Sequence, residues 1–333
     1  RLFLQKFLRQ AVAAHCDYAI IEMTSEGAKQ HRHRFIELDA LIFTNLSPEH
    51  IESHGSYQKY LAAKLSLAQA LERSAKPNKV LVVNGDDQAA TEFLKITVPT
   101  KLRFELSGAK PITVSPTHTT LMVAGEQVTT PLLGTFNLYN ILAATSFAQS
   151  QNIKPRIIKQ AVEGFGGVRG RLEPVGRQAF EVFVDYAHTP DSLKQVYEIF
   201  KQRRLICLLG GTGGGRDRWK RPAMGQLAGH YCHSVILTNE DPYDEDPVKI
   251  VREIAAGVDG PRPQIIMDRR LAIREAIKQA KPGNVVLITG KGTDPYIMGA
   301  RGLKTPWDDA EVVRQELKRL ERESNQSLTR QPL

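Results

Sequence analysis

The stretch Glu181–Ser192, EVFVDYAHTPDS, determines how the rest of the chain is organised. Its first four residues alternate and are β-rich, which predicts a strand, and Pro190 suits the first turn of a helix that Leu193–Phe200 continues at helical spacing. Asp185–His188 therefore lie where a strand ends and a helix begins. In open α/β sheets this edge binds ligands, because strand ends and helix N-termini point backbone donors and short polar side chains into one crevice.

After this stretch the chain alternates strands and helices. Strands are predicted at residues 205–211, 234–240, 264–268 and 285–290, and helices from about Pro222, at 247–256, at 269–280 and from about Asp308. This rhythm predicts a doubly wound, mostly parallel, Rossmann-like sheet. The polar tail from about Arg322 is expected to be disordered.

Before this stretch the sequence predicts a second α/β domain that starts in mid-fold. We expect an amphipathic helix at 2–14, buried parallel strands at 17–24, 38–46 and 79–87, a helix from Tyr57, an antiparallel β-meander at 101–134 and a helix after it. Residues 164–171, GFGGVRGR, hold four glycines and form the best domain boundary. We therefore predict a central domain at 1–170 and a C-terminal domain at 171–333.

Composition restricts the class of protein. The 333 residues are 41% hydrophobic and 24% charged, as in soluble globular proteins with room for two cores. Because we find no membrane-spanning apolar run and no signal peptide, we expect a cytoplasmic protein, and we also expect a monomer. Cys16, Cys207 and Cys232 are far apart and are expected to be buried or inert thiols.

The net charge of +9 is spread among acidic residues, without a long basic run. This distribution argues against nucleic-acid binding and suits a small substrate that carries phosphate.

Several motifs together resemble one family. DYAHTPDSL at 185–193 closely resembles the start of the C-terminal domain of Mur ligases, particularly of the MurE branch. IIEMTSEGAKQHR at 20–32, TNLSPEHIESHGSYQKYLAAK at 44–64 and GGTGGGRDRWKRP at 210–222 resemble further segments of that family. The resemblance implies an ATP-dependent amide ligase of peptidoglycan synthesis, which adds the third amino acid to a UDP-N-acetylmuramoyl-dipeptide through an acyl phosphate.

The resemblance also implies a magnesium (Mg2+) site. Glu22 and His50 fall on the family's metal-binding positions, and Lys64 falls on that of a carbamylated lysine. A lysine ammonium repels a metal, whereas a carbamate supplies the anionic oxygens that magnesium prefers. From the residues alone, a helix-capping glutamate, a solvated histidine and a surface lysine are the alternatives.

Four positions match ATP contacts of the family. Asn137 and Asn140 correspond to adenine-contacting asparagines, Arg171 to an arginine that contacts ATP, and Asp185 to the acceptor of the ribose hydroxyls. Asn137 could equally cap a helix, and Asn140 could be an exposed polar residue.

The remaining matches concern the other two substrates. Thr24, Gln30 and Arg32 fall on positions that grip the muramoyl-dipeptide, and Arg221 on one that holds the incoming amino acid or the acyl phosphate. The amino-acid pocket implied by the resemblance comprises Glu240, Asp241, Tyr243, Gly290 and Asp294. Tyr243 replaces the arginine of a D-N-P-R motif and Asp294 the glutamate of G-K-G-H-E, so the amino acid added stays open.

The sequence contains no GxxGK[ST] loop to cradle a γ-phosphate. In the family that loop and a UDP-binding domain precede the Glu22 segment, so we expect the chain to represent the last two thirds of a ligase and to be inactive alone. Two other hypotheses remain. One is another amide ligase of the superfamily, of the cyanophycin, folylpolyglutamate or MurF type, and the other is a non-catalytic homologue.

Overall fold

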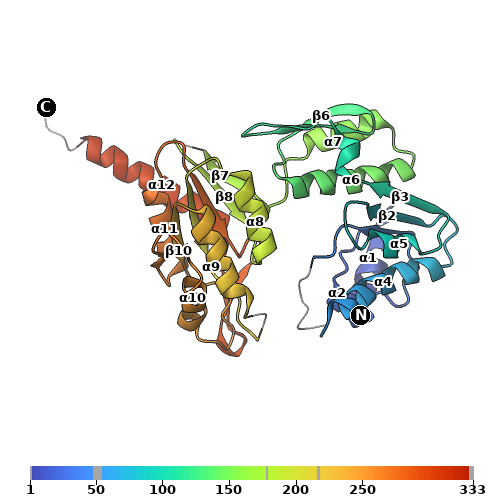
Figure 1. Cartoon of the computed structure of the whole chain (residues 1–333), viewed down its shortest axis with the longest axis horizontal. Helices are drawn as coiled ribbons and strands as arrows, with labels where there is room; N and C mark the ends of the chain where they lie inside the picture. Colours follow the sequence, from blue (N-terminus) through green and yellow to red (C-terminus); the bar gives the residue numbers. More distant parts are fainter. Residues whose placement is uncertain (1, 48–54, 178, 216–217, 330–333) are drawn as a thin grey trace. The chain divides into compact units, whose positions relative to one another are not determined.

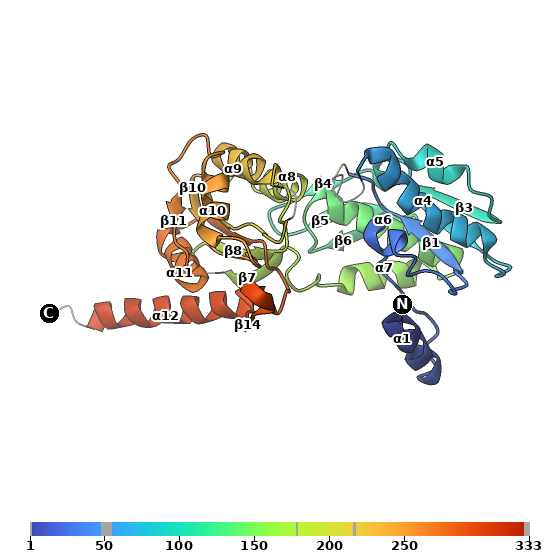
Figure 2. The ribbon, with the colours of Figure 1, turned by 90° about the horizontal axis from the view of Figure 1, so that it is seen from below.

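The computed structural model of the protein, shown in Figures 1 and 2, describes residues 2–47, 55–177, 179–215 and 218–329. The chain divides into two compact units, residues 1–165 and 166–333. This division falls inside the glycine-rich stretch 164–171, five residues before the boundary that we predicted.

The C-terminal unit is built on one six-stranded sheet, in the order β11-β10-β9-β12-β8-β7. The strands are β7 (Glu173–Arg177), β8 (Glu181–Asp185), β9 (Leu205–Leu209), β10 (Ser234–Leu237), β11 (Gln264–Ile265) and β12 (Val285–Thr289). Every neighbouring pair is parallel except β7 and β8, which are antiparallel at the edge. The predicted doubly wound sheet is therefore confirmed.

Helices cover both faces of this sheet. They are α8 (Pro190–Ile199), α9 (Lys220–Tyr231), α10 (Pro247–Ala255), α11 (Arg269–Gln279) and α12 (Asp309–Thr329). α11 and α12 share a buried cluster with Val182 and Val184 of β8, whereas Phe183 packs against Phe200 at the end of α8. Because strand side chains alternate between faces, α8 lies on the opposite face from α11 and α12. A short hairpin, β13 (Tyr296–Met298) and β14 (Lys304–Pro306), with the 3-10 turn η2 (Ala300–Gly302), follows β12.

The deciding stretch folds as its sequence predicts. β8 ends at Asp185, and α8 begins with Pro190 in its first turn. Thr189 caps this helix by accepting a hydrogen bond from the Ser192 amide, and the Ser192 side chain accepts one from the Thr189 amide. This reciprocal capping satisfies two amides that the helix itself cannot pair.

The N-terminal unit contains a parallel sheet, β1-β2-β3, and a separate antiparallel sheet, β4-β5-β6. The strands are β1 (Ala40–Phe43), β2 (Val80–Asn84), β3 (Thr100–Phe104), β4 (Thr113–Val114), β5 (Thr119–Val123) and β6 (Glu126–Thr130). The helices are α1 (Leu2–Ala13), α2 (Ser25–Lys29), α4 (Tyr57–Arg73), α5 (Ala90–Leu94), α6 (Thr135–Ser150) and α7 (Pro155–Gly164), with the 3-10 turn η1 (Leu106–Ala109). One face of β2 packs on α6, and the other packs on α4 and α5. Figure 2 shows α1 standing clear of the parallel sheet.

Two sequence predictions for this unit were wrong. Residues 17–24 form no strand, and Tyr18 and Ile20 are exposed. The segment has no strand partner among the described residues, so its apolar run forms no ladder. β3 belongs to the parallel sheet rather than to the meander, because it pairs with β2.

Two further predictions were wrong in the C-terminal unit. The tail from Arg322 continues α12 as far as Thr329, and an i,i+4 ion pair between Arg319 and Glu323 supports that extension. Cys207 and Cys232 form a disulfide rather than two thiols. Cys16, in the N-terminal unit, is a free and exposed thiol, and its inertness stays a prediction. The disulfide could not be predicted from the sequence, because the two cysteines meet only when α9 folds back alongside β9.

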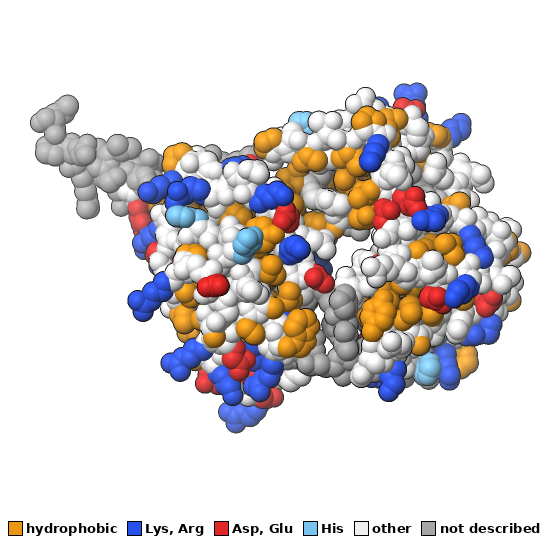
Figure 3. Space-filling view, viewed as in Figure 1, with side chains coloured by type: hydrophobic (Ala, Val, Ile, Leu, Met, Phe, Trp, Pro, Cys, Tyr) orange, Lys and Arg blue, Asp and Glu red, His pale blue; other side chains and the backbone are white. Residues whose placement is uncertain are grey.

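No helix in the described part of the chain is long and apolar enough to cross a membrane. On the face seen in Figure 3, lysines and arginines lie among acidic, apolar and uncharged side chains.

Candidate active site

The candidate site of the C-terminal unit lies at the carboxyl edge of its sheet. Asp185 ends β8, Thr212 follows β9, Glu240 follows β10, and Lys291 follows β12. These strands are neighbours and parallel, so the residues that follow them meet at one edge. Thr212 and Lys291 were not predicted as site residues, although both lie in glycine-rich turns directly after strands, and this position in the sequence could have identified them.

Asp185 links the strand end to the segment before β7. Its Oδ2 accepts a hydrogen bond from the Leu172 amide at 2.6 Å, and its Oδ1 accepts one from the Ala187 amide at 2.7 Å. Burial raises the pKa of Asp185, and the two backbone hydrogen bonds and the Arg171 charge oppose that rise. The carboxylate is thus held in place before any ligand binds.

Arg171 lies beside the same strand end. Its guanidinium carbon sits 4.2 Å from the centre of the Tyr186 ring, and this ring meets the His188 ring edge to face at 4.7 Å. The structure thus brings together Arg171 and Asp185, the two predicted ATP contacts of this unit. Their role in ATP binding stays a prediction.

A buried ion pair occupies the centre of the edge. The Lys291 ammonium lies 2.9 and 2.8 Å from the two carboxylate oxygens of Asp241, and its side chain is only 1% exposed. Asp241 also accepts a hydrogen bond from the Met298 amide, and Asp294 lies 3.6 Å from the same ammonium. Asp241 and Asp294, both predicted for the amino-acid pocket, therefore share one cation.

Glu240 is buried next to this pair. Its Oε1 accepts a hydrogen bond from the Thr212 hydroxyl at 2.9 Å, whereas its Oε2 has no hydrogen-bond partner within the described structure. Gly290 packs against this carboxylate with φ at +109°, where a Cβ would collide with Oε2. This position therefore requires glycine.

The Arg221 side chain is buried and forms ion pairs within the C-terminal unit. Its side chain is 1% exposed, and its Nη1 and Nη2 donate to Glu253 at 2.6 Å and Glu245 at 3.0 Å. Nη2 also donates to the Thr212 carbonyl at 3.2 Å. These bonds fix α9 against the turn after β9, and Nε is the guanidinium atom that lacks a partner among the described residues. A direct contact with substrate stays a prediction.

Tyr243 lies at the rim of this edge. Its backbone has φ at +50°, its amide donates to the Met298 carbonyl at 3.0 Å, and its ring lies against Gly214. The side chain that replaces the expected arginine thus packs on the glycine-rich turn after β9.

In the N-terminal unit, the predicted dipeptide-binding residues surround α2. Thr24 caps that helix through the Gly27 amide at 3.1 Å, Gln30 ends it, and Arg32 donates through Nε to Gln30 at 3.0 Å. Thr24 and Gln30 therefore lie at the two ends of one short helix, and Arg32 lies in the turn that follows it.

The predicted metal ligands are only partly described. Lys64 lies on α4, and its Nζ donates to the Asn45 carbonyl at 3.1 Å and lies 5.4 Å from the Tyr60 ring centre. Glu22 is exposed in an irregular segment, and His50 lies outside the described residues. No cluster of three acidic, histidine or cysteine ligands occurs in the described ranges.

The turn after β1 reveals two supporting residues that the sequence analysis missed. Asn84 donates through Nδ2 to the Thr44 carbonyl at 2.8 Å, and Asp87 accepts from the Leu46 amide at 2.8 Å. Both follow or end β2 and hold the Asn45 carbonyl in place for Lys64. Their signal in the sequence is the acidic tetrapeptide NGDD at the end of a strand.

The predicted adenine contacts lie on α6. Asn137 donates through Nδ2 to the Leu133 carbonyl at 2.8 Å, and Asn140 donates to Asn137 at 3.4 Å. Gly134 is the N-cap of α6, so the alternative of Asn137 as the cap is wrong. Asn140 is exposed on the helix.

The chain matches known proteins of one family. Residues 1–148 match the Mur ligase middle domain, and residues 170–292 match the Mur ligase glutamate ligase domain. Over 95% of its length the chain is 35% identical to the UDP-N-acetylmuramyl-tripeptide synthetase of a Roseiflexus species, of which it covers 68%. The chain belongs to the Mur ligase family. The first domain match ends at residue 148 and the second begins at residue 170, so the division between residues 165 and 166 falls between them.

Other relatives place this Mur ligase on the MurE branch. It is 36% identical, over 95% of its length, to the UDP-N-acetylmuramoyl-L-alanyl-D-glutamate–2,6-diaminopimelate ligase of Gloeobacter violaceus and covers 66% of that enzyme. A solved structure of a ligase of that name matches 96% of the chain with a TM-score of 0.62 and 31% identity, and 68% of it is covered. MurF of Thermotoga maritima in complex with ADP matches with a TM-score of 0.65 over 90% of the chain and 66% of MurF, but its 16% identity shows the fold alone. The chain spans about two thirds of the length of the curated relatives it matches.

Proposed function

We propose that the protein is an ATP-dependent amide ligase that adds the third amino acid to UDP-N-acetylmuramoyl-L-Ala-D-Glu in peptidoglycan synthesis. The observation that carries the proposal is the carboxyl edge of the C-terminal sheet. There Asp185 is held next to Arg171, and the buried Lys291–Asp241 pair lies next to Glu240. Relatives 32 to 37% identical are named for this class of reaction.

The reaction has two steps. The dipeptide carboxylate attacks the γ-phosphorus of ATP, which forms an acyl phosphate and releases ADP. The incoming amine then attacks the acyl carbon, the carbon–oxygen bond to phosphate breaks, and the amine loses a proton as the amide forms.

Residues of both units would serve these steps. Asp185 would accept the ribose hydroxyls through its remaining lone pairs, and Thr24, Gln30 and Arg32 would hold the muramoyl-dipeptide. Magnesium would neutralise phosphate charge when bound. Glu22, His50 and a carbamate on Lys64 would hold it. The exposed Glu22 carboxylate and the approach of Lys64 to the Asn45 carbonyl suit an ion that prefers oxygen ligands.

Of the three substrates, the incoming amino acid is the one whose identity is least well defined by the sequence. Relatives are named for 2,6-diaminopimelate, which makes it the first compound to test. Because Tyr243 stands where the resemblance implies an arginine, lysine should be tested in parallel. We further propose that the enzyme works as a cytoplasmic monomer.

The test uses the protein expressed from its complete reading frame, with UDP-N-acetylmuramoyl-L-Ala-D-Glu, ATP, magnesium and each amino acid in turn. Mass spectrometry should detect the tripeptide product, with one ADP released for each product molecule. Lys64→Ala should abolish product, while Lys59→Ala, on the same helix and exposed, should not. Wild-type product from Lys64→Ala, or binding of the dipeptide without turnover, would support the non-catalytic alternative, and turnover only with the substrates of another superfamily member would support that ligase.

A further inference from the structure

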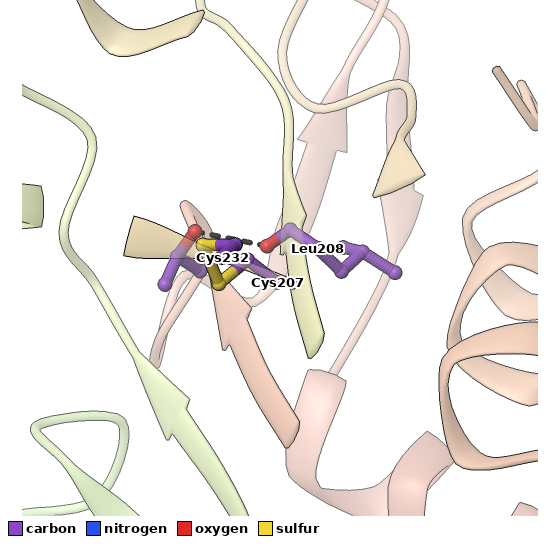
Figure 4. The surroundings of a disulfide bond; sticks show 4 residues. Cys207, Leu208 and Cys232 are labelled. Carbon is purple, nitrogen blue, oxygen red and sulfur yellow. Dashed lines mark hydrogen bonds between the residues drawn. A yellow bond between two sulfur atoms is a disulfide. The ribbon is translucent and has the colours of Figure 1, made fainter. Parts of the chain in front are cut away.

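A disulfide joins the centre of the C-terminal sheet to the end of a helix. Cys207, the middle residue of β9, is bonded to Cys232, which caps the C-terminus of α9, and their Cα atoms are 6.0 Å apart (Figure 4). The two residues are 0% and 4% exposed. Since they are 25 positions apart in the sequence, the bond turns the end of β9, the following turn and all of α9 into one covalent ring.

This ring encloses only part of the candidate site. It contains Thr212, whose hydroxyl donates a hydrogen bond to Glu240 of the predicted amino-acid pocket. It also contains Arg221, which donates hydrogen bonds to the Thr212 carbonyl and to Glu245. Asp185, Arg171 and Lys291 lie outside it. The predicted amino-acid pocket lies outside it too, but the ring contacts this pocket through Thr212, which binds Glu240, and through the Gly213 amide, which donates to the Asp241 carbonyl. The bond therefore constrains a turn that contacts the predicted amino-acid pocket.

Both ends of α9 are fixed in this arrangement. Near its start, Gly225 packs directly on the backbone of α10, where a Cβ would collide with the Ile254 carbonyl, and Arg221 binds Glu245 and Glu253. At its end, the disulfide ties the helix to β9. Because a helix is stiff, loss of the disulfide frees the C-terminal end of α9, and the whole helix can then pivot about the contacts near its start.

We propose that Cys207 and Cys232 form a thiol–disulfide lock on this ring. When oxidised, the lock holds α9 and residues 208–215 in the geometry described above; when reduced, it lets them open more often. This regulation rests on the proposed function for naming the segment as part of the amino-acid site. In the reducing compartment that we expect for the protein, disulfides are mostly transient and redox-sensing.

The chemistry is exchange with a low-molecular-weight disulfide as oxidant or a dithiol as reductant. In oxidation, one cysteine thiolate attacks the reagent disulfide and expels a reagent thiol, and the second thiolate then attacks the mixed disulfide and expels the other. The protein loses two protons and two electrons, and the reagent disulfide becomes two thiols. Burial of both sulfur atoms makes this exchange slow in the folded protein, because α9 must open at its C-terminal end first.

The first test is performed on the 333-residue chain in its oxidised and reduced forms. Oxidised glutathione should convert the reduced form, and dithiothreitol should reverse the change, as followed by thiol alkylation and intact mass. One cysteine should be alkylated in the oxidised form and three in the reduced form. Amides of residues 218–231 should exchange hydrogen at least about tenfold faster when reduced, whereas β12 should not change.

Variants separate the lock from other effects. Cys232→Ser should reproduce the exchange of the reduced form and lose its response to oxidant, and Cys16→Ser should behave as wild type. Equal exchange in the two redox states, or thiols that glutathione disulfide never joins in the folded chain, would overturn the lock. Neither readout needs ligase activity, so failure of the proposed function would not be mistaken for failure of the lock.

In the complete protein the lock should act on one substrate only. Reduction should raise the KM for the amino acid several-fold and leave the KM for ATP unchanged, because the ring is hydrogen-bonded to Glu240 and Asp241 of the predicted amino-acid pocket and not, among the described residues, to the predicted ATP contacts. An equal rise in both KM values would contradict a local lock and indicate general loosening of the unit.

Discussion

Replacing Arg269 by methionine should destabilise the C-terminal unit more than any neighbouring substitution. The Arg269 side chain is 1% exposed, and its Nε and Nη2 donate to the Asp309 carboxylate at 2.8 and 2.6 Å. The same guanidinium donates to the Thr289 carbonyl at 2.8 Å and the Asn239 carbonyl at 3.3 Å. It therefore ties the ends of β10 and β12 to the start of α12.

The loss of stability depends on the buried Asp309 carboxylate, which remains without its cation. Asp309 is 0% exposed, and after the substitution it keeps one hydrogen bond, from the Trp307 indole at 2.7 Å. Removing one partner of a buried ion pair costs about 3 to 5 kcal/mol, because the remaining charge is buried without compensation. Adding Asp309→Leu removes that charge, so the double variant should recover much of the loss.

Urea unfolding followed by tryptophan fluorescence measures this effect in the right unit. The chain has two tryptophans, Trp219 and Trp307, and both belong to residues 166–333. Arg270→Met is the matched control, since its side chain is 40% exposed and its pair with Glu316 should contribute less than about 1 kcal/mol. If the two single variants unfolded at the same urea concentration, the buried pair would not hold the edge as described.

Two further predictions use the same unfolding assay. Hydrogen bonds from Arg274 and Arg270 hold the pKa of Glu316 below its ordinary value of 4.5. The ionised carboxylate therefore stabilises the folded state above pH 4.5. This contribution is lost as the pH falls through the lower pKa of the folded state. Glu316→Gln should therefore lower the unfolding free energy by about 1 kcal/mol at neutral pH, and a gap from wild type that did not shrink below pH 4.5 would contradict this cause. Gly290→Ala should cost about 1 to 3 kcal/mol through its positive φ and the collision with Glu240, and a double-mutant cycle with Glu240→Ala should show coupling rather than additivity.

The sequence predicts this fold best where one local signal is sufficient. The capped strand–turn–helix at Asp185 and Pro190 needs only neighbours along the chain, and it forms as predicted. The segment at residues 17–24 has the composition of a strand, but a strand also needs a hydrogen-bonding partner, which composition does not specify. The Cys207–Cys232 bond likewise depends on where α9 returns along β9.

In the candidate site, too, local motifs identified individual residues but not the partners that lie far away in the sequence. Motif resemblance singled out Asp241 and Arg221, but the sequence did not reveal that Lys291 neutralises the first or that Glu245 and Glu253 neutralise the second. These partners lie 24 to 50 positions away and follow different strands. Pairing of this kind is decided by sheet order rather than by spacing.

The paired charges also bear on which substrate this edge suits. Lys291 and Arg221 are buried cations, yet each already faces carboxylates, so a triphosphate would have to displace Asp241 or Glu245 to reach them. An amino acid carries both an ammonium and a carboxylate, and it can add to such a network while leaving its charge balanced. Within the described ranges, Glu240 Oε2 and Arg221 Nε have no hydrogen-bond partner, and the ammonium and the carboxylate of such a zwitterion could pair with them. The buried network of the C-terminal unit is therefore consistent with our proposal that this edge binds the amino acid, and it is less suited to binding phosphate.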